Sequence, residues 1–362
     1  MPLYDYLVVG AGLFGATFAQ QAVKSEKRVM VVERRDHVAG NCFDALVGGI
    51  QVHRYGPHIF HTSDLRIWQY VNRFADFKSY WHTVQAVTRA GVLGLPISLH
   101  TLNMLHGIAT PARAQAYFER VRDPSATGDS AEAWCLRTIG RELYELLIEP
   151  YTVKQWGCSP RELPASIVKR LPIRMTWDNS YFSDQYQGIP IDGYTRMVEL
   201  MLSSTDVYLN VDFLANRDAL RKVARKVVYS GQVDSLFGCD EGKLPYRSIR
   251  IEQEVLPIPD FQGTAQMNYP TPDVPWTRIT EPKHFVGGKQ PHTVICKEFS
   301  GSDGEPAYPI GTHDNTALAQ AYIKRAEAEG YIVGGRLGRY QYLDMHQAIG
   351  MALSMAKKEL VA

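Results

Sequence analysis

Cysteine is scarce in this sequence, with five residues in 362, no two of them close together and no CxxC spacing. An odd, scattered set argues against a disulfide framework or a zinc ribbon and fits a reducing compartment. We therefore expect a cytoplasmic protein. His58 and His61 have HxxH spacing but lack a neighbouring carboxylate base, so no metal site is expected.

The sequence also lacks an excess of charge and a long apolar run. Lys and Arg number 39 and Asp and Glu 38, a net charge of +1 that gives no support for wholesale nucleic-acid binding. No apolar run approaches membrane-spanning length, and residues 1–5 lack the pattern of a signal peptide. We expect neither nucleic-acid binding nor membrane insertion. The length suggests two or three domains.

A strand, a helix and a second strand open the chain. Tyr4–Val9 is a short apolar run that ends in glycines, which is typical of a buried parallel strand. Residues 11–24 have a helical pattern, and residues 28–32 (RVMVV) predict another strand. This order predicts the opening of a doubly wound α/β sheet.

Gly10, Gly12 and Gly15 form a GxGxxG fingerprint between the first strand and the helix. Gly10 permits the tight turn, Gly12 lets the backbone approach a pyrophosphate, and Gly15 lets helix and strand pack closely. The helix N-terminus offers free N–H groups to the anion. Glu33 ends the second strand, where a carboxylate accepts hydrogen bonds from ribose hydroxyls. These features predict a dinucleotide site; the alternative is a tight turn without a ligand.

Two further small-residue turns favour FAD over NAD. The first follows Glu33 and resembles FAD-dependent amine-oxidase-like folds, whose backbone passes the pyrophosphate a second time. The second, Gly334-Gly335-Arg336, lies between a predicted strand and a predicted helix. Asp344, at the start of that helix, either caps it or bonds the ribityl chain. The predicted cofactor-binding residues are Gly10, Gly12, Leu13, Phe14, Gly15, Glu33, Arg34, Gly40, Asn41, His58, Gly335, Arg336, Asp344 and Met345.

The middle of the chain changes character twice. Residues 102–147 are rich in Ala, Leu, Glu and Arg and predict helices, interrupted by a polar loop at 123–130. Residues 152–187 are rich in Pro, Trp, Arg and Tyr, which predicts loops and an exposed ligand surface. Antiparallel strands are expected at 84–95, 248–254 and 292–299. Near the C-terminus, the expected elements are a helix at 317–328, a strand at 331–333 and a helix at 345–359.

Five segments in a fixed order resemble the prokaryotic UDP-galactopyranose mutases, and they span nearly the whole chain. Five ordered matches are far more specific than one glycine motif. The segments are 55–62 (YGPHIFHT), 151–157 (YTVKQWG) with 169–172 (KRLP), 186–190 (YQGIP) with 193–194 (GY), 275–281 (PWTRITE) and 342–346 (YLDMH).

The resemblance implies an α/β fold with a Rossmann-like FAD-binding domain, an inserted helical domain and an antiparallel β-sheet domain. The Rossmann-like domain is expected to be discontinuous, from 1–76, about 190–230 and 310–362. The helical domain is expected at about 100–165, with a mobile substrate loop near 156–172. The sheet domain is expected at about 77–99, 173–189 and 235–309.

The resemblance also implies an isomerase that interconverts UDP-galactopyranose and UDP-galactofuranose without net redox change. The reaction would pass through a covalent adduct between the sugar and N5 of FAD, which is active only when reduced. Because the cofactor supplies the nucleophile, no Ser-His-Asp set is needed. The implied partners are UDP-galactose as substrate, an external reductant such as NADPH, and further copies of the chain in a homo-oligomer.

The protein must hold a diphosphate in such a reaction, and arginine suits this because its fork donates several charge-assisted hydrogen bonds. By the resemblance, Arg170 and Arg278 contact the phosphates, and Arg336 and His61 lie near the flavin; these four are the predicted catalytic residues. Tyr151 stacks on uracil. The predicted substrate contacts are Tyr151, Trp156, Arg170, Tyr181, Phe182, Arg278, Tyr308, Tyr342, His82 and Asn268.

Two positions depart from the family pattern. His82 stands where many members have Asn, and Leu147 stands where an aromatic residue often lies beside uracil. Without the resemblance, two other interpretations are as good as ligand contact: Arg170 as a solvated surface charge and Trp156 as a core residue. The alternative functions are an FAD-dependent oxidase or dehydrogenase of the amine-oxidase-like class, which needs no pair of phosphate-binding arginines, and a non-catalytic nucleotide-binding protein.

Overall fold

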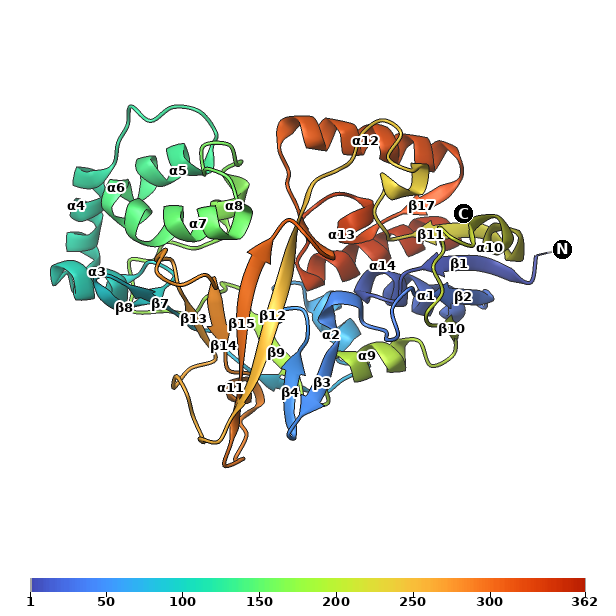
Figure 1. Cartoon of the computed structure of the whole chain (residues 1–362), viewed down its shortest axis with the longest axis horizontal. Helices are drawn as coiled ribbons and strands as arrows, with labels where there is room; N and C mark the ends of the chain where they lie inside the picture. Colours follow the sequence, from blue (N-terminus) through green and yellow to red (C-terminus); the bar gives the residue numbers. More distant parts are fainter. Residues whose placement is uncertain (1, 362) are drawn as a thin grey trace.

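Five parallel strands form one sheet, in the order β10-β2-β1-β11-β17. The computed structural model describes residues 2–361, and it draws these strands from three distant parts of the chain (Figure 1). Their bounds are Asp206–Tyr208 (β10), Val29–Val32 (β2), Tyr4–Val9 (β1), Ala224–Tyr229 (β11) and Tyr331–Val333 (β17). The predicted strands at 4–9 and 331–333 are confirmed with those bounds, and the second strand begins one residue later than expected.

Helices cover both faces of this sheet, which explains why its strands are apolar without alternation. Val8 packs in one cluster with α1 (Leu13–Lys24), α9 (Gly193–Met201) and α14 (Met345–Val361). The neighbouring Leu7 packs on the other face with α10 (Arg217–Val223) and α12 (His313–Ala328). The predicted helices near residues 11–24, 317–328 and 345–359 are therefore confirmed, and they form the two outer layers of the sheet.

A second, seven-stranded sheet lies between the parallel sheet and a group of helices (Figure 1). The expected antiparallel strands are present, but the sheet is mixed, because β13 pairs with β7 in parallel. Its long central pair, β12 and β15, is antiparallel. In spatial order, the strands are Pro306–Pro309 (β16), Tyr246–Leu256 (β12), Thr293–Gly301 (β15), Arg278–Thr280 (β14), Gln266–Asn268 (β13), Val84–Thr88 (β7) and Gly91–Leu95 (β8).

The helical region packs on the β7–β8 hairpin of the large sheet, where Ala86 and Leu93 are fully buried against the helices. The predicted polar loop lies between α4 and α5. The helices are Leu99–His106 (α3), Pro111–Val121 (α4), Ala131–Thr138 (α5), Gly140–Leu143 (α6), a π-helical turn at Tyr144–Ile148, Glu149–Trp156 (α7) and Ser166–Lys169 (α8).

The prediction of loops throughout residues 152–187 is partly wrong, because α7 continues to Trp156 and α8 occupies 166–169. Pro150 lies in the first turn of α7, where a missing N–H costs nothing, and Gly157 ends that helix with φ 71°. Pro150 and Gly157 therefore mark the two ends of a helix whose last turn extends into the stretch predicted as loops.

Two small sheets join the larger parts. Asp44 in the first of them accepts hydrogen bonds from the backbone N–H groups of Tyr194 (2.7 Å) and Thr195 (2.9 Å), which holds the start of α9. The first sheet is Asp44–Val47 (β3) with Ile50–His53 (β4), and the second is Phe60–Thr62 (β5), Tyr186–Pro190 (β9) and Phe77–Ser79 (β6). The remaining elements are Leu65–Val71 (α2), Lys283–Val286 (α11), Gly335–Gly338 (α13) and 3₁₀ turns at Gly40–Cys42 and Ser235–Phe237.

The predicted fold class is confirmed by this mixture of a Rossmann-like sheet, a helical group and a second sheet. The division into three domains by residue range stays a prediction. Within residues 2–361, no helix is long and apolar enough to cross a bilayer.

Candidate active site

A cleft of about 380 Å³ lies at the carboxyl ends of the parallel strands, the position where doubly wound sheets bind ligands. The GxGxxG turn, the end of β2 and the turn at Gly40 form its walls. All the predicted cofactor residues except Asp344 line this cleft; Asp344 lines the neighbouring cavity.

Two glycines of the GxGxxG fingerprint differ in whether the fold itself requires them. A Cβ at Gly15 would lie 2.0 Å from the carbonyl oxygen of Gly10, so this position requires glycine for the fold itself. A Cβ at Gly12 would come no closer than 3.8 Å to another protein atom, the Cα of Gly40, and its φ of −77° suits any residue. The fold itself therefore does not require glycine at position 12, which fits a cofactor that passes against this turn.

Glu33 is buried at the end of β2 and its carboxylate is held in place. Oε2 accepts from the backbone N–H of Ala11 (2.9 Å), and Oε1 accepts from that of Arg35 (3.0 Å). Each oxygen keeps a second lone pair, which suits ribose hydroxyl donors. Arg34, which is exposed, forms an ion pair with Glu305 at the rim of the cleft.

We predict that Gly12→Val loses FAD but keeps the fold, because the added atoms enter the cleft and not the core. The measurement is flavin absorbance per protein together with the thermal unfolding temperature. Gly15→Ala is the matched comparison, and it should lower stability because its methyl meets the Gly10 carbonyl. A fully yellow Gly12→Val protein would contradict the assignment of this cleft.

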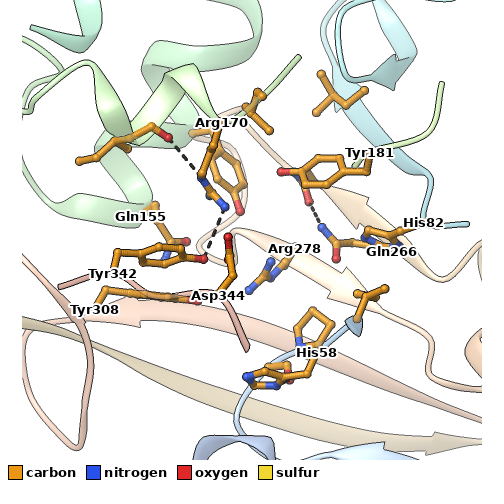
Figure 2. Close-up of a pocket in the computed structure, with 18 of the residues that line it drawn as sticks. His58, His82, Gln155, Arg170, Tyr181, Gln266, Arg278, Tyr308, Tyr342 and Asp344 are labelled. Atoms are coloured by element: carbon orange, nitrogen blue, oxygen red, sulfur yellow. Dashed lines mark hydrogen bonds between the residues drawn. The ribbon is translucent and has the colours of Figure 1, made fainter. Parts of the chain in front are cut away.

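A second cavity, of about 170 Å³, lies between the large sheet and the helices α7 and α8 (Figure 2). All ten predicted substrate residues line it, and so does His61. Four residues, Asn41, His58, Arg336 and Met345, line both this cavity and the cofactor cleft. A ligand in the second cavity therefore touches the same wall as a cofactor in the first.

Arg278 reaches this cavity from β14 and forms a buried ion pair. Its Nη2 and Nε lie 2.7 and 2.8 Å from Oε2 of Glu298, its cross-strand neighbour on β15. Glu298 is 1% exposed, and within the described chain its Oε1 has no hydrogen-bond partner. The carboxylate fixes the guanidinium, which still has N–H groups to offer an anion.

Arg170 approaches the same cavity from the helical side and is exposed, just past the end of α8. Its Nη1 donates weakly to the hydroxyl of Tyr342 (3.4 Å), and its guanidinium lies 5.2 Å from that ring. Tyr342 stacks on Tyr308 at 5.6 Å, and Arg336 lies over both rings. The two tyrosines thus carry hydroxyl groups between three arginines.

Helix α7 supplies the aromatic side of the cavity. Trp156 is 9% exposed and lies 6.1 Å from the ring of Tyr308. Tyr151 is one turn earlier, and burial raises the pKa of its hydroxyl, which therefore remains protonated. Leu147 and Ile148 come from the π-helical turn before α7, so an aliphatic surface stands at this end.

Three histidines near the cavities are neutral: His53 and His82 are buried, and His58 is half-buried. Burial lowers the pKa of His58 and His82 to about 3 and that of His53 to about 4. His53 accepts through Nδ1 from the backbone N–H of His58 (3.0 Å), and His82 lies beside Tyr181 and Phe182. A neutral imidazole at position 82 keeps a donor and an acceptor, as an asparagine would.

These depressed pKa values predict a loss of stability in acid. An unfolded histidine has a pKa of about 6.5, so below that pH the unfolded chain binds protons that the folded chain excludes. The free energy of unfolding should fall by about 1.4 kcal/mol per pH unit for each such histidine between about pH 6 and pH 4. Urea unfolding at several pH values measures this slope. In His82→Asn, this slope should decrease by the contribution of one histidine, about 1.4 kcal/mol per pH unit. An unchanged slope would contradict burial of a neutral His82.

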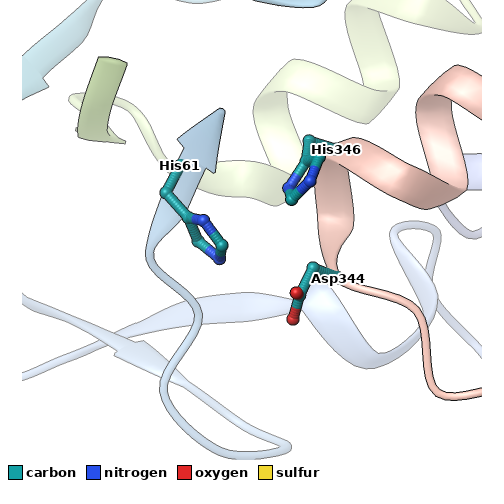
Figure 3. Close-up of side chains that lie close together, drawn as sticks. All are labelled: His61, Asp344 and His346. Carbon is teal, nitrogen blue, oxygen red and sulfur yellow. The ribbon is translucent and has the colours of Figure 1, made fainter. Parts of the chain in front are cut away.

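His61 lies on β5 in a cluster that sequence reasoning found only in part. His61, Asp344 and His346 each offer a ligand atom within 4.8 Å of the others (Figure 3). No hydrogen bond within residues 2–361 ends on the Asp344 carboxylate; Gln347 Oε1 instead accepts from the Asp344 N–H (2.9 Å), as in half of a capping box. The Asp344 carboxylate therefore does not cap the helix through any described residue, Asp344 lines the substrate cavity, and its bond to the ribityl chain stays a prediction.

Two glutamines that line the cavity were not among the predicted site residues. Gln155 lies inside α7, its Oε1 is buried, and no described residue donates to it. Gln266 donates to Asn268 (2.9 Å) across one face of β13. Gln155 belongs to the 151–157 segment of the resemblance, but the chemistry of a glutamine singles out neither residue, and only their position on elements that line the cavity reveals them.

Comparison with known proteins decides the family. The family described as UDP-galactopyranose mutase matches residues 146–342, more than half of the chain, and an NAD(P)-binding Rossmann-like domain matches residues 8–74. A probable UDP-galactopyranose mutase of Klebsiella pneumoniae is 40% identical over 98% of this chain and 94% of its own length. The chain belongs to the UDP-galactopyranose mutase family.

Other relatives show the breadth of this mutase family. A dTDP-fucopyranose mutase of Escherichia coli is 34% identical over 97% of both chains. The UDP-galactopyranose mutase of Mycoplasma genitalium is 31% identical over 99% of this chain and 95% of its own. Among solved structures, a reduced UDP-galactopyranose mutase has the same fold, with a TM-score of 0.81 over 99% of this chain and 96% of the other at 12% identity.

Family membership and the dinucleotide cleft together confirm the prediction of FAD as cofactor. A putative protoporphyrinogen oxidase from Exiguobacterium also shares the fold, with a TM-score of 0.67 over 100% of this chain and 99% of the other at 13% identity. That likeness extends to the fold alone, so the oxidase alternative gains no support from it.

Proposed function

We propose that this chain interconverts UDP-galactopyranose and UDP-galactofuranose on reduced FAD, without net redox change. The observation that carries the proposal is the shared wall between the two cavities, because Arg336 and its neighbours bring a nucleotide-sugar site against a cofactor site. An oxidase of a small amine would not need a cavity with arginines on opposite sides.

The arginines suit a diphosphate that must be held both before and after it leaves the sugar. Arg170 enters from α8 and Arg278 from the large sheet, and Figure 2 draws both in one cavity with Tyr308 and Tyr342. Charge-assisted hydrogen bonds from guanidinium forks and tyrosine hydroxyls stabilise a leaving diphosphate. Bound, reduced FAD supplies the nucleophile for the anomeric carbon, so no nucleophilic side chain is required.

The exposed position of Arg170 supports a mobile substrate loop near 156–172. Arg278 is held by Glu298, whereas Arg170 makes only one weak contact across the cavity. A diphosphate between them would attract the α8 segment inward. Such closure would exclude water from the sugar while its bond to the diphosphate is broken.

The setting of the enzyme is part of the same proposal. All five cysteines are free, which suits the reducing cytoplasm. An external reductant such as NADPH would reduce the FAD.

Exposed apolar side chains near α3, Met104 and Trp177, offer a surface for a homo-oligomer. UDP-galactose is the proposed substrate.

The same isomerisation of a dTDP-6-deoxysugar is a second candidate. It is favoured by the relative named dTDP-fucopyranose mutase, which matches almost the whole chain. The aliphatic pair Leu147 and Ile148 at one end of the cavity would accept a methyl group on the base. The two candidates differ in the substrate and share the chemistry.

We predict that dithionite-reduced enzyme converts UDP-galactofuranose to UDP-galactopyranose and that oxidised enzyme does not. No reductant should be consumed per turnover, because the cofactor ends each cycle reduced. Chromatography of the nucleotide sugars, run in parallel with dTDP-fucofuranose, measures the products. Reductant consumption equal to product would instead indicate an oxidoreductase, and faster turnover of the dTDP-sugar would select the second candidate.

We predict that Arg170→Ala lowers kcat/KM by roughly 30- to 1000-fold, since one charge-assisted contact to the diphosphate is worth on the order of 2–4 kcal/mol. FAD content and stability should stay at the wild-type level, because Arg170 is exposed and lies outside the cofactor cleft. Arg170→Lys should restore activity only in part, since an ammonium lacks the planar fork.

Arg278→Ala is the informative comparison. It should lose activity and also about 3–5 kcal/mol of stability, because it leaves Glu298 buried without its partner. Near wild-type activity of Arg170→Ala would mean that Arg170 is an ordinary surface charge.

A further inference from the structure

Asp184 holds His61 by a short hydrogen bond that the family motifs do not include. Its Oδ2 lies 2.6 Å from Nδ1 of His61, and its Oδ1 accepts from the hydroxyl of Ser63 at 2.8 Å. Asp184 precedes β9, which pairs with β5 so that His61 lies opposite Gln187. The backbone pairing of two strands therefore sets the position of this carboxylate relative to the imidazole.

The imidazole of His61 is confined on its other sides as well. Its ring stacks on Phe182 at 3.8 Å and 10°, and it meets the edge of His346 at 5.0 Å. His61 is 8% exposed, on the wall of the substrate cavity. These contacts fix the plane of the ring. Within that plane, the contact with Asp184 places Nδ1, and not Nε2, on the Asp184 side.

The charge on Asp184 decides which nitrogen of His61 carries the hydrogen. Burial works to raise the pKa of Asp184, but hydrogen bonds from His61 and Ser63 outweigh burial and leave that pKa below its usual value. The carboxylate is ionised at neutral pH and can only accept. Nδ1 of His61 must therefore donate, and in the neutral ring Nε2 keeps its lone pair.

A fixed acceptor in this cavity matches a requirement of the proposed isomerisation. When the six-membered ring becomes five-membered, the oxygen on C4 loses a proton and becomes the ring oxygen. The oxygen on C5 leaves the ring and gains a proton. One proton moves between two oxygens of the same sugar, with no net gain or loss. A neutral imidazole with one free nitrogen can take that proton and return it.

We propose that Asp184 is a positioning residue that fixes the Nδ1–H tautomer of His61, so that Nε2 accepts and returns the proton exchanged between the sugar oxygens. This inference rests on the proposed mutase function. The titratable groups that face His61 are Asp184 from the β9 side, Asp344 and His346 from the start of α14, and His82 from the segment before β7. Burial lowers the pKa of His346, and the neighbouring His61 lowers it further. The ring of His346 beside His61 is therefore neutral.

The test is Asp184→Asn, which keeps the shape of the side chain and removes its charge. We expect kcat to fall by roughly 10- to 100-fold, less than the loss of the proton-transferring group itself because Asp184 acts through His61, with KM changed less than about threefold. Asp178→Asn is the matched control, because Asp178 is a carboxylate in the same segment that pairs with Arg174 instead. Ser63→Ala should have a smaller effect in the same direction, since the carboxylate stays but loses one donor.

A second readout is independent of turnover. ¹⁵N spectra of histidine-labelled protein, loaded with oxidised FAD, report which ring nitrogen of His61 carries hydrogen; the His61→Gln spectrum assigns its signals. We expect a single Nδ1–H form in the wild type and in Asp178→Asn, and a mixture of tautomers in Asp184→Asn.

Two outcomes would overturn the inference. One is an unchanged His61 tautomer in Asp184→Asn, whatever happens to its activity. The other is an altered tautomer with wild-type kcat. If the wild type itself turns over no nucleotide sugar while the tautomer still responds to Asp184→Asn, the positioning by Asp184 stands and the proposed function falls.

Discussion

The ion pair between Arg278 and Glu298 is the interaction on which the substrate site depends. It joins two neighbouring strands of the large sheet, and it fixes a guanidinium on the wall of the substrate cavity. A lone buried charge would be costly, and Glu298 offsets that cost while leaving donors free. In the proposed function, the exposed Arg170 would close on a bound diphosphate from the opposite side of the cavity. One cation fixed by an ion pair and one exposed cation would suit a diphosphate that binds, leaves the sugar and returns.

The shared wall of the two cavities turns this anion site into a site for chemistry. Asn41 and His58 come from the first half of the Rossmann-like part, and Arg336 and Met345 come from its last helices. The chain must therefore return from the helical region to the parallel sheet before the site is complete. The same return places Asp344 and His346 beside His61, where the inferred proton exchange would occur.

Local signals in the sequence account for much of the fold. The strand at 4–9, the fingerprint and the helix after it could be predicted because glycine spacing and apolar runs act within a few residues. The ligand cavity could be predicted only through the family resemblance, because Arg170, Tyr308 and Tyr342 lie far apart in the chain. The parallel pairing of β13 with β7, the Asp184–His61 contact and the placement of Asp344 depend on tertiary packing. Residues 152–156 were mistaken for a loop because the composition of 152–187 was taken as a whole, although the helix continues as far as Gly157.

The central claim is that the arginines hold a diphosphate that separates from the sugar during each turnover. Positional isotope exchange tests it most directly, with UDP-galactose that carries ¹⁸O in the bridge between the sugar and the diphosphate. On reduced enzyme, we predict that the label moves into a non-bridging position of the recovered substrate, because the held phosphate rotates before it returns; oxidised enzyme should cause no exchange. Isomerisation with the label retained entirely in the bridge would contradict the account, in which the separated phosphate turns between the arginines before it returns.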